Sequence, residues 1–126
     1  MDDEQDILDS LKALLESSMP GLKCRTAGSA AEALKVLESG GVDLILCDYR
    51  MPGMDGLKFL EIARQKAPNV PRILMTAFPH LELAIEAINE ARVEIFLTKP
   101  MDPDKFISVV RETLEARERA KGQAAA

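Results

Sequence analysis

Residues 42–56 decide the fold of this chain, and they read VDLILCDYRMPGMDG. The first six are mostly apolar, which is the pattern of a strand buried on both faces of a parallel sheet. The run ends on a carboxylate, Asp48, and a loop punctuated by proline and glycine follows. Ligands and chemistry collect just beyond the carboxyl ends of the strands in open parallel sheets. Asp48 is therefore a candidate for chemistry.

Helical and strand-like segments alternate along the rest of the chain. Apolar residues at helical spacing predict five helices, at about 4–17, from Ser29 to Gly40, from Leu57 to Pro68, at 81–90 and from Asp102 onward. Short apolar runs predict four strands, at 22–27, 42–47, 72–76 and 94–98. This alternation with short connections predicts an α/β domain, in which a doubly wound parallel sheet carries helices on both faces.

Composition excludes several classes of function. The chain has 126 residues and a formal net charge of −5 without a basic stripe, which argues against direct binding to nucleic acid. No apolar run approaches the roughly 20 residues that span a bilayer. Cys24 and Cys47 lack metal-ligand spacing, so we expect two reduced thiols in a cytoplasmic protein. We assign residues 1–118 to one domain and residues 119–126 to a tail or linker.

Polar side chains are expected to gather at one edge of the sheet. Asp2 and Asp3 precede the first helix, while Asp48, Thr76 and Lys99 close three successive strands. Clustered carboxylates repel one another and favour a hard divalent cation such as Mg²⁺. A carboxylate beside such an ion can attack a phosphoryl group, because the metal and an ammonium group neutralise the developing charge.

Four short motifs, in this order on this α/β pattern, resemble the receiver domain of bacterial two-component response regulators. They are Asp2-Asp3-Glu4, Asp48 followed by Met51-Pro52-Gly53-Met54-Asp55-Gly56, Met75-Thr76-Ala77, and Phe96-Leu97-Thr98-Lys99-Pro100. The resemblance covers essentially residues 2–118. It implies a flavodoxin-like fold and a phosphoprotein of two-component signalling.

The resemblance also implies a role for each residue at the phosphorylation site. Asp48 would be the phosphoacceptor, taking a phosphoryl group from a sensor histidine kinase. Asp2 and Asp3 would hold Mg²⁺, together with Asp48 and the backbone carbonyl of Arg50.

Three further residues would read out the phosphorylation. Thr76 and Lys99 would contact the phosphoryl oxygens, and Phe96 would change rotamer as the threonine moves. The switch would repack the face formed by helix 81–90, strand 94–98 and the last helix, where a partner or effector binds. Such a switch shifts a two-state equilibrium through local charge.

The chain departs from the family at its beginning. Receiver domains begin with an apolar strand that runs into the acidic pair and lies at the centre of the sheet, and that strand is missing here. Its five or so apolar side chains would contribute about 10 kcal/mol at roughly 1.5–3 kcal/mol each. Because a domain has only about 5–15 kcal/mol of net stability, an empty central slot is implausible in a standard monomer.

Three explanations of the missing strand remain open. A second protomer could fill the slot, which would give a homo-oligomer and is the explanation we favour. Residues 22–27 could instead shift and pair directly with residues 42–47. The sequence could also be a fragment of a longer one. Since Asp2 and Asp3 lose a rigid carrier, we expect weakened Mg²⁺ binding and slowed phosphorylation of Asp48.

Two other functions compete with the phosphorylation switch. One is an inert pseudo-receiver that acts as an oligomerisation or protein-interaction module. The other is a hydrolase with Asp48 as nucleophile, like the haloacid-dehalogenase phosphatases. Those enzymes place an aspartate two residues after the nucleophile, where this chain has Arg50. We therefore expect that the chain is not an enzyme.

Overall fold

The computed structural model of the protein describes residues 1–2, 4–49, 56–76, 87, 89, 95–98 and 102–125. Within these residues the chain forms four helices and three strands. The helices are α1 (Gln5–Ser18), α2 (Ala30–Glu38), α3 (Gly56–Lys66) and α5 (Pro103–Ala125). The strands are β1 (Ile45–Asp48), β2 (Arg72–Thr76) and β3 (Ile95–Thr98).

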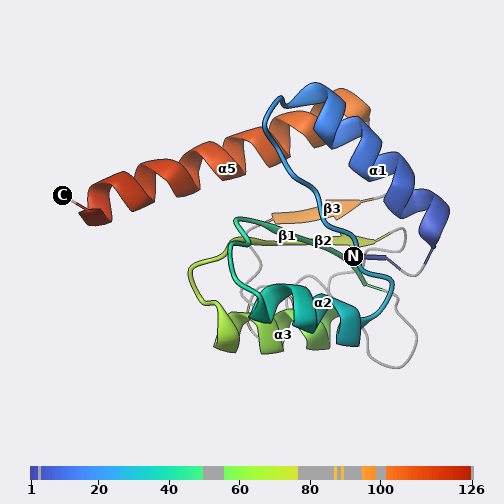
Figure 1. Ribbon diagram of the computed structural model, residues 1–126, viewed down its shortest axis with the longest axis horizontal. Coiled ribbons are helices and arrows are strands. Elements are labelled where there is room, and N and C mark those ends of the chain that lie inside the picture. Colours follow the sequence, from blue (N-terminus) through green and yellow to red (C-terminus); the bar gives the residue numbers. More distant parts are fainter. Residues whose placement is uncertain are drawn as a thin grey trace.

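The strands form a parallel sheet in the order β1-β2-β3, with Asp48 opposite Met75 and Thr76 opposite Thr98. Figure 1 shows α1 and α5 on one face of this sheet and α2 and α3 on the other. The predicted doubly wound α/β fold is therefore confirmed. No helix in the described part of the chain is long and apolar enough to cross a membrane.

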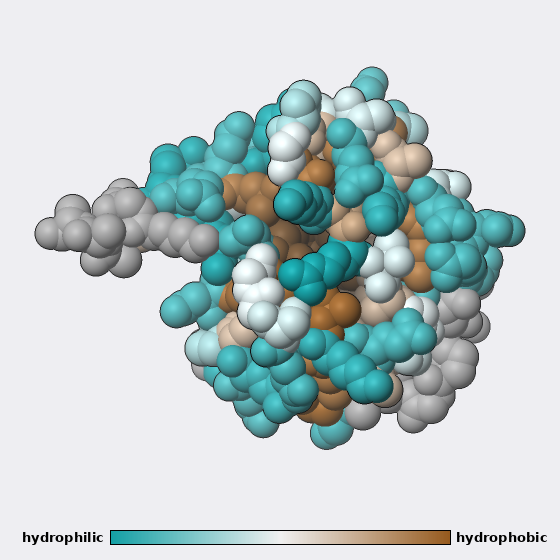
Figure 2. All heavy atoms as spheres, in the orientation of Figure 1, coloured by the Kyte–Doolittle hydropathy of each residue, from teal (hydrophilic) through white to brown (hydrophobic). Residues whose placement is uncertain are grey.

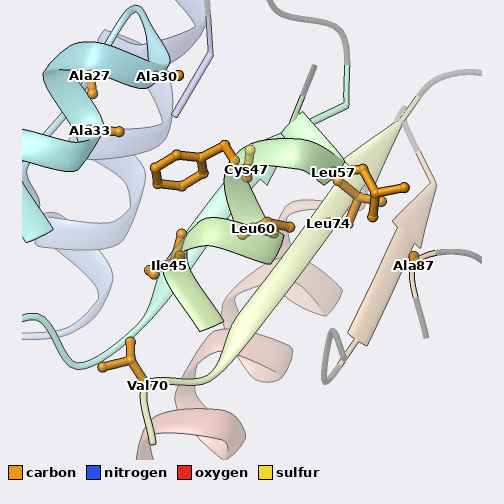
Figure 3. Packing of buried hydrophobic residues seen from close by; sticks show 12 residues of the cluster. Ala27, Ala30, Ala33, Ile45, Cys47, Leu57, Leu60, Val70, Leu74 and Ala87 are labelled. Carbon is orange, nitrogen blue, oxygen red and sulfur yellow. The ribbon is translucent and has the colours of Figure 1, made fainter. Parts of the chain in front are cut away.

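The alternation of side chains along β2 divides the interior into two cores. Leu74 packs with the α3 residue Leu60 in a cluster between the sheet and helices α2 and α3, which Figure 3 shows from close by. Its neighbours Ile73 and Met75 pack with Phe106 in a second cluster, beneath α1 and α5. Every residue of β2 is buried, because successive side chains of a central strand enter opposite cores.

Several predicted boundaries agree with the structure and one element does not. Ser29 caps α2, since its hydroxyl accepts a hydrogen bond from the Glu32 amide at 3.2 Å. The strand expected over residues 42–47 begins later and ends on Asp48. Residues 22–27 are not a strand, so the prediction of four strands from this chain is wrong at this position.

The shift of residues 22–27 onto β1 is also absent from the described structure. The edge of β1 that faces away from β2 instead receives Met1, whose nitrogen donates to the Leu46 carbonyl at 2.6 Å. The Asp48 amide donates to the Met1 carbonyl at 3.0 Å.

Two predictions for the second half of the chain, the helix over residues 81–90 and the domain boundary at residue 118, are not decided by the described residues. The helix expected over residues 81–90 lies outside the described residues except for positions 87 and 89. Helix α5 continues to Ala125 and projects beyond the body of the domain in Figure 1. The domain boundary at residue 118 stays a prediction.

Candidate functional site

Asp48 and Thr76 end neighbouring strands at the same edge of the sheet. The Tyr49 amide donates to the Met75 carbonyl at 2.9 Å, so the β1–β2 ladder continues one residue beyond Asp48. Asp48 is partly exposed, whereas Thr76 is 2% exposed. The parallel register therefore places the candidate phosphoacceptor beside the strand that ends in the candidate hydroxyl ligand.

Backbone hydrogen bonds place Asp2 next to this strand end. Met1 bonds to Leu46 and Asp48 on one side, and the Asp2 amide donates to the Ala27 carbonyl at 3.2 Å on the other. The Asp2 side chain is 1% exposed, and its Oδ1 accepts a hydrogen bond from the Glu4 amide at 3.0 Å. Two residues thus hold the position that a complete strand would occupy at this edge.

The α-ammonium group of Met1 is buried in this arrangement. Burial lowers the pKa of this group from its ordinary value of 8.0, while the nearby Cys47 and Asp2 oppose the shift. The ammonium donates to the Leu46 carbonyl, as a backbone amide of a strand would do. Its charge therefore lies against the backbone of β1, close to the candidate site.

Gly56 fixes the return of the loop that follows Asp48. Its amide donates to the Tyr49 carbonyl at 2.7 Å. A Cβ atom at this position would overlap the Asp48 carbonyl oxygen and would lie 2.9 Å from the Cys47 sulfur. The sequence motif included Gly56 but did not reveal this close approach. The only available signal was a glycine directly before the predicted helix that begins at Leu57.

The oxygen donors at this edge fit a hard cation. Asp2 and Asp48 supply carboxylate oxygens, which Mg²⁺ prefers as protein ligands. Asp3 and Arg50, the other two predicted ligands, lie outside the described residues, as does Lys99. Among the residues that are described, no three acidic, histidine or cysteine side chains form a metal-binding group. Two of the four predicted metal ligands, Asp2 and Asp48, thus lie near one another along the backbone, since the Asp48 amide bonds to the residue before Asp2, and the metal site stays a prediction.

The predicted switch residues are described only in part. Phe96 lies in β3 opposite Leu74, which places its backbone but not its ring.

Comparison with known proteins decides the family. Residues 1–111 match the response regulator receiver domain. The chain belongs to that family. Receiver domains are signalling modules of two-component systems, and they generally bind Mg²⁺ at the phosphorylation site and interact with sensor histidine kinases and effector domains.

Individual relatives of this receiver domain support the same assignment. The hydrogenase transcriptional regulatory protein HoxA of Cupriavidus necator is 37% identical over 117 residues, which cover 93% of this chain and 24% of HoxA. The chain spans about a quarter of the length of the curated relatives that it matches first.

Solved receiver structures share the fold closely. A CheY-like receiver domain protein from Methanospirillum hungatei is 31% identical with a TM-score of 0.88, over 94% of this chain and 93% of that one. The signal receiver domain of an HD domain-containing protein from Pseudomonas fluorescens is 36% identical with a TM-score of 0.87, over the same shares of the two chains.

Proposed function

We propose that this receiver domain accepts a phosphoryl group on Asp48 from a sensor histidine kinase in the cytoplasm. The observation that carries the proposal is the position of Asp48, which ends β1 beside Thr76 and next to the backbone that holds Asp2. Phosphorylation would then alter the face formed by residues 81–90, β3 and α5, to which a partner or effector domain binds.

The proposed transfer exchanges one phosphorus bond for another. The Asp48 carboxylate attacks the phosphorus of a phosphohistidine, the bond from phosphorus to the imidazole nitrogen breaks, and an acyl phosphate forms. The Thr76 hydroxyl and the Lys99 ammonium group would hold the phosphoryl oxygens. Mg²⁺, when bound by Asp2, Asp3, Asp48 and the Arg50 carbonyl, would supply positive charge to those oxygens.

We further propose that Asp48 reacts more slowly than in a receiver domain with a complete central strand. Among the described residues, Met1 bonds to β1 and Asp2 bonds to Ala27, so a two-residue segment holds the candidate metal-binding carboxylate of Asp2 in place.

Titration with Mg²⁺ tests this impairment. The 126-residue chain is incubated with acetyl phosphate at increasing Mg²⁺ concentrations, and the phosphorylated fraction is followed by intact mass. We expect a high Mg²⁺ concentration for half-maximal rate and a low maximal rate, compared with a receiver domain that has the strand. Equal values for the two proteins would refute the impairment, and a complete lack of reaction would favour the inert interaction module.

The expected homo-oligomer stays a prediction. A second protomer that covers the apolar surface left by the missing strand would be detected by light scattering on a sizing column. A stable monomer at micromolar concentration would contradict it.

A further inference from the structure

Helix α5 crosses the sheet from one edge to the other. It begins shortly after β3 ends, at the edge that holds Asp48 and Thr76, and in Figure 1 it runs back past the opposite edge. From Pro103 to Arg117 the helix rises about 21 Å, at about 1.5 Å for each residue. Arg117 therefore lies at the amino edge of the sheet, one helix length away from the candidate phosphorylation site.

Apolar contacts hold the first part of α5 against the domain. Phe106 and Val110 are buried in the core beneath this helix, and Leu114 packs against the same cluster. These three residues are spaced four apart, so they share one face of the helix. Residues 115, 116 and 118–120 are exposed, and Figure 2 shows hydrophilic residues where α5 leaves the body of the domain. Over residues 115–120, burial of apolar side chains therefore does not fix the helix.

Arg117 makes polar contacts to the domain one turn after Leu114. Its Nε lies 3.3 Å from Asp43 Oδ1, and its Nη1 donates a hydrogen bond to the Asn69 carbonyl. The Arg117 side chain is only 15% exposed, although the residues on either side of it along the helix are exposed. A planar guanidinium group can donate to two acceptors at once in a fixed geometry. We call Arg117, Asp43 and Asn69 the α5 clamp.

The two acceptors of the α5 clamp belong to the segments that lead into β1 and β2. Asp43 precedes β1 and Asn69 precedes β2. The Ile45 amide joins these segments, since it donates to the Pro71 carbonyl at 3.0 Å. An isolated ion pair at a surface contributes little, but here one side chain bridges two segments that the sheet holds side by side. The clamp therefore ties the second half of α5 to the sheet itself.

Thr113 marks a point at which α5 can bend. Its hydroxyl donates to the carbonyl of Val109, four residues earlier, at 2.7 Å. Such a bond competes with the backbone hydrogen bonds of the helix and often bends it. Thr113 lies about one turn from the buried Val110 on one side and from Arg117 on the other. If the clamp opens, the helix after Thr113 can therefore swing while Phe106 and Val110 stay in the core.

We propose that the α5 clamp fixes the direction in which residues 118–125, the α5 arm, leave the domain. With the clamp closed, the arm keeps a constant angle to the sheet, and a partner that binds the arm is held at that angle. With the clamp open, the arm pivots at Thr113 and stays helical, because residues 115–121 are all strong helix formers. The proposal does not depend on phosphorylation of Asp48, and its test includes no phosphorylation step.

The distance between two spin labels measures the direction of the α5 arm. The labels are attached through Ser10→Cys on α1 and Ala120→Cys on the arm, both at exposed positions. Cys24→Ser removes the half-buried thiol from this chain, and Cys47 is fully buried. We expect a narrow distribution of label distances in this parent chain. Pulsed electron paramagnetic resonance measures the width of that distribution.

Two arginine substitutions on the same helix locate the effect. Arg117→Ala should make the distribution at least twice as wide, with unchanged helix content by circular dichroism. Arg119→Ala is the matched control, since Arg119 is exposed, and it should leave the width unchanged. Equal widths in R117A and the parent chain would overturn the proposal, as would equal broadening in R119A.

Substitution of Asp43 keeps the test decisive if R117A loses helix content. Asp43→Asn should broaden the distribution less than R117A is expected to, because the Asn69 carbonyl still accepts from Arg117. An unchanged width in D43N would overturn the proposal. The double variant D43N/R117A should be no broader than R117A alone. An additive effect would show that Asp43 and Arg117 act separately, and it would also overturn the clamp.

Discussion

At the level of single residues, Gly56 allows the chain to pass close to Asp48. Gly56→Ala would place a methyl group against the Asp48 carbonyl and the Cys47 sulfur. We expect the substitution to lower the free energy of unfolding by about 1–3 kcal/mol, the usual cost of overpacking. It should also slow phosphorylation of Asp48, since the strand end must move. Urea denaturation and acetyl phosphate labelling measure the two effects.

Gly28→Ala is the matched control for that substitution. A Cβ atom on Gly28 would meet only ordinary contacts at 3.9 Å, from the Asp2 carbonyl and the Glu32 carboxylate. Its unfolding free energy and its labelling rate should stay close to those of the parent chain. Equal losses in both variants would contradict a special role for the approach at Gly56.

The environment of Cys24 predicts how its reactivity depends on pH. Burial and then the negative charge of Glu16 raise the pKa of the Cys24 thiol above its ordinary value of 9.0. Because the thiolate is the nucleophile, alkylation should be slower than for an exposed cysteine at pH 8, and its rate profile should have its inflection above pH 9.0. Glu16→Gln should move the rate profile to lower pH. An inflection of the alkylation rate below pH 9.0 would contradict the raised pKa of Cys24.

The start of α2 shows what a short sequence signal can specify about an element. Ser29 accepts a hydrogen bond from the Glu32 amide, and Glu32 accepts one from the Gly28 amide at 3.0 Å. Ser29→Ala should lower the free energy of unfolding by about 1 kcal/mol, and Ser29→Asp should largely preserve it. Thermal denaturation followed by circular dichroism measures the change. If Ser29→Asp lowered the free energy of unfolding as much as Ser29→Ala does, that result would contradict the capping role.

The elements also differ in how far they can be predicted from sequence. Residues 73–75 are continuously apolar, and burial alone specifies such a central strand. Residues 22–27 instead alternate apolar with charged or polar side chains, and a strand also requires a neighbour with which it can form hydrogen bonds. In the described structure Asp2 bonds to Ala27 but residues 22–27 form no strand, so the local pattern gave the wrong assignment there.

At the scale of the whole molecule, the alternation of helices and strands predicted the doubly wound fold, and the strand ends predicted that Asp48 and Thr76 share an edge. One feature depended on non-local geometry and was not predictable, namely the use of Met1 as a ladder partner of Leu46. It follows from a backbone hydrogen bond between distant segments, which no local pattern encodes.

The most direct test of the account is intact-mass measurement of the chain after incubation with acetyl phosphate and Mg²⁺, beside the variants Asp48→Asn and Asp43→Asn. Asp43 is a second aspartate in the same segment, but it lies away from the strand end. It forms an ion pair with Arg117, with 3.3 Å between Asp43 Oδ1 and Arg117 Nε. We predict one added phosphoryl group on the parent chain and on D43N, and none on D48N. Equal labelling of D48N, or loss of labelling in D43N alone, would contradict Asp48 as the phosphoacceptor.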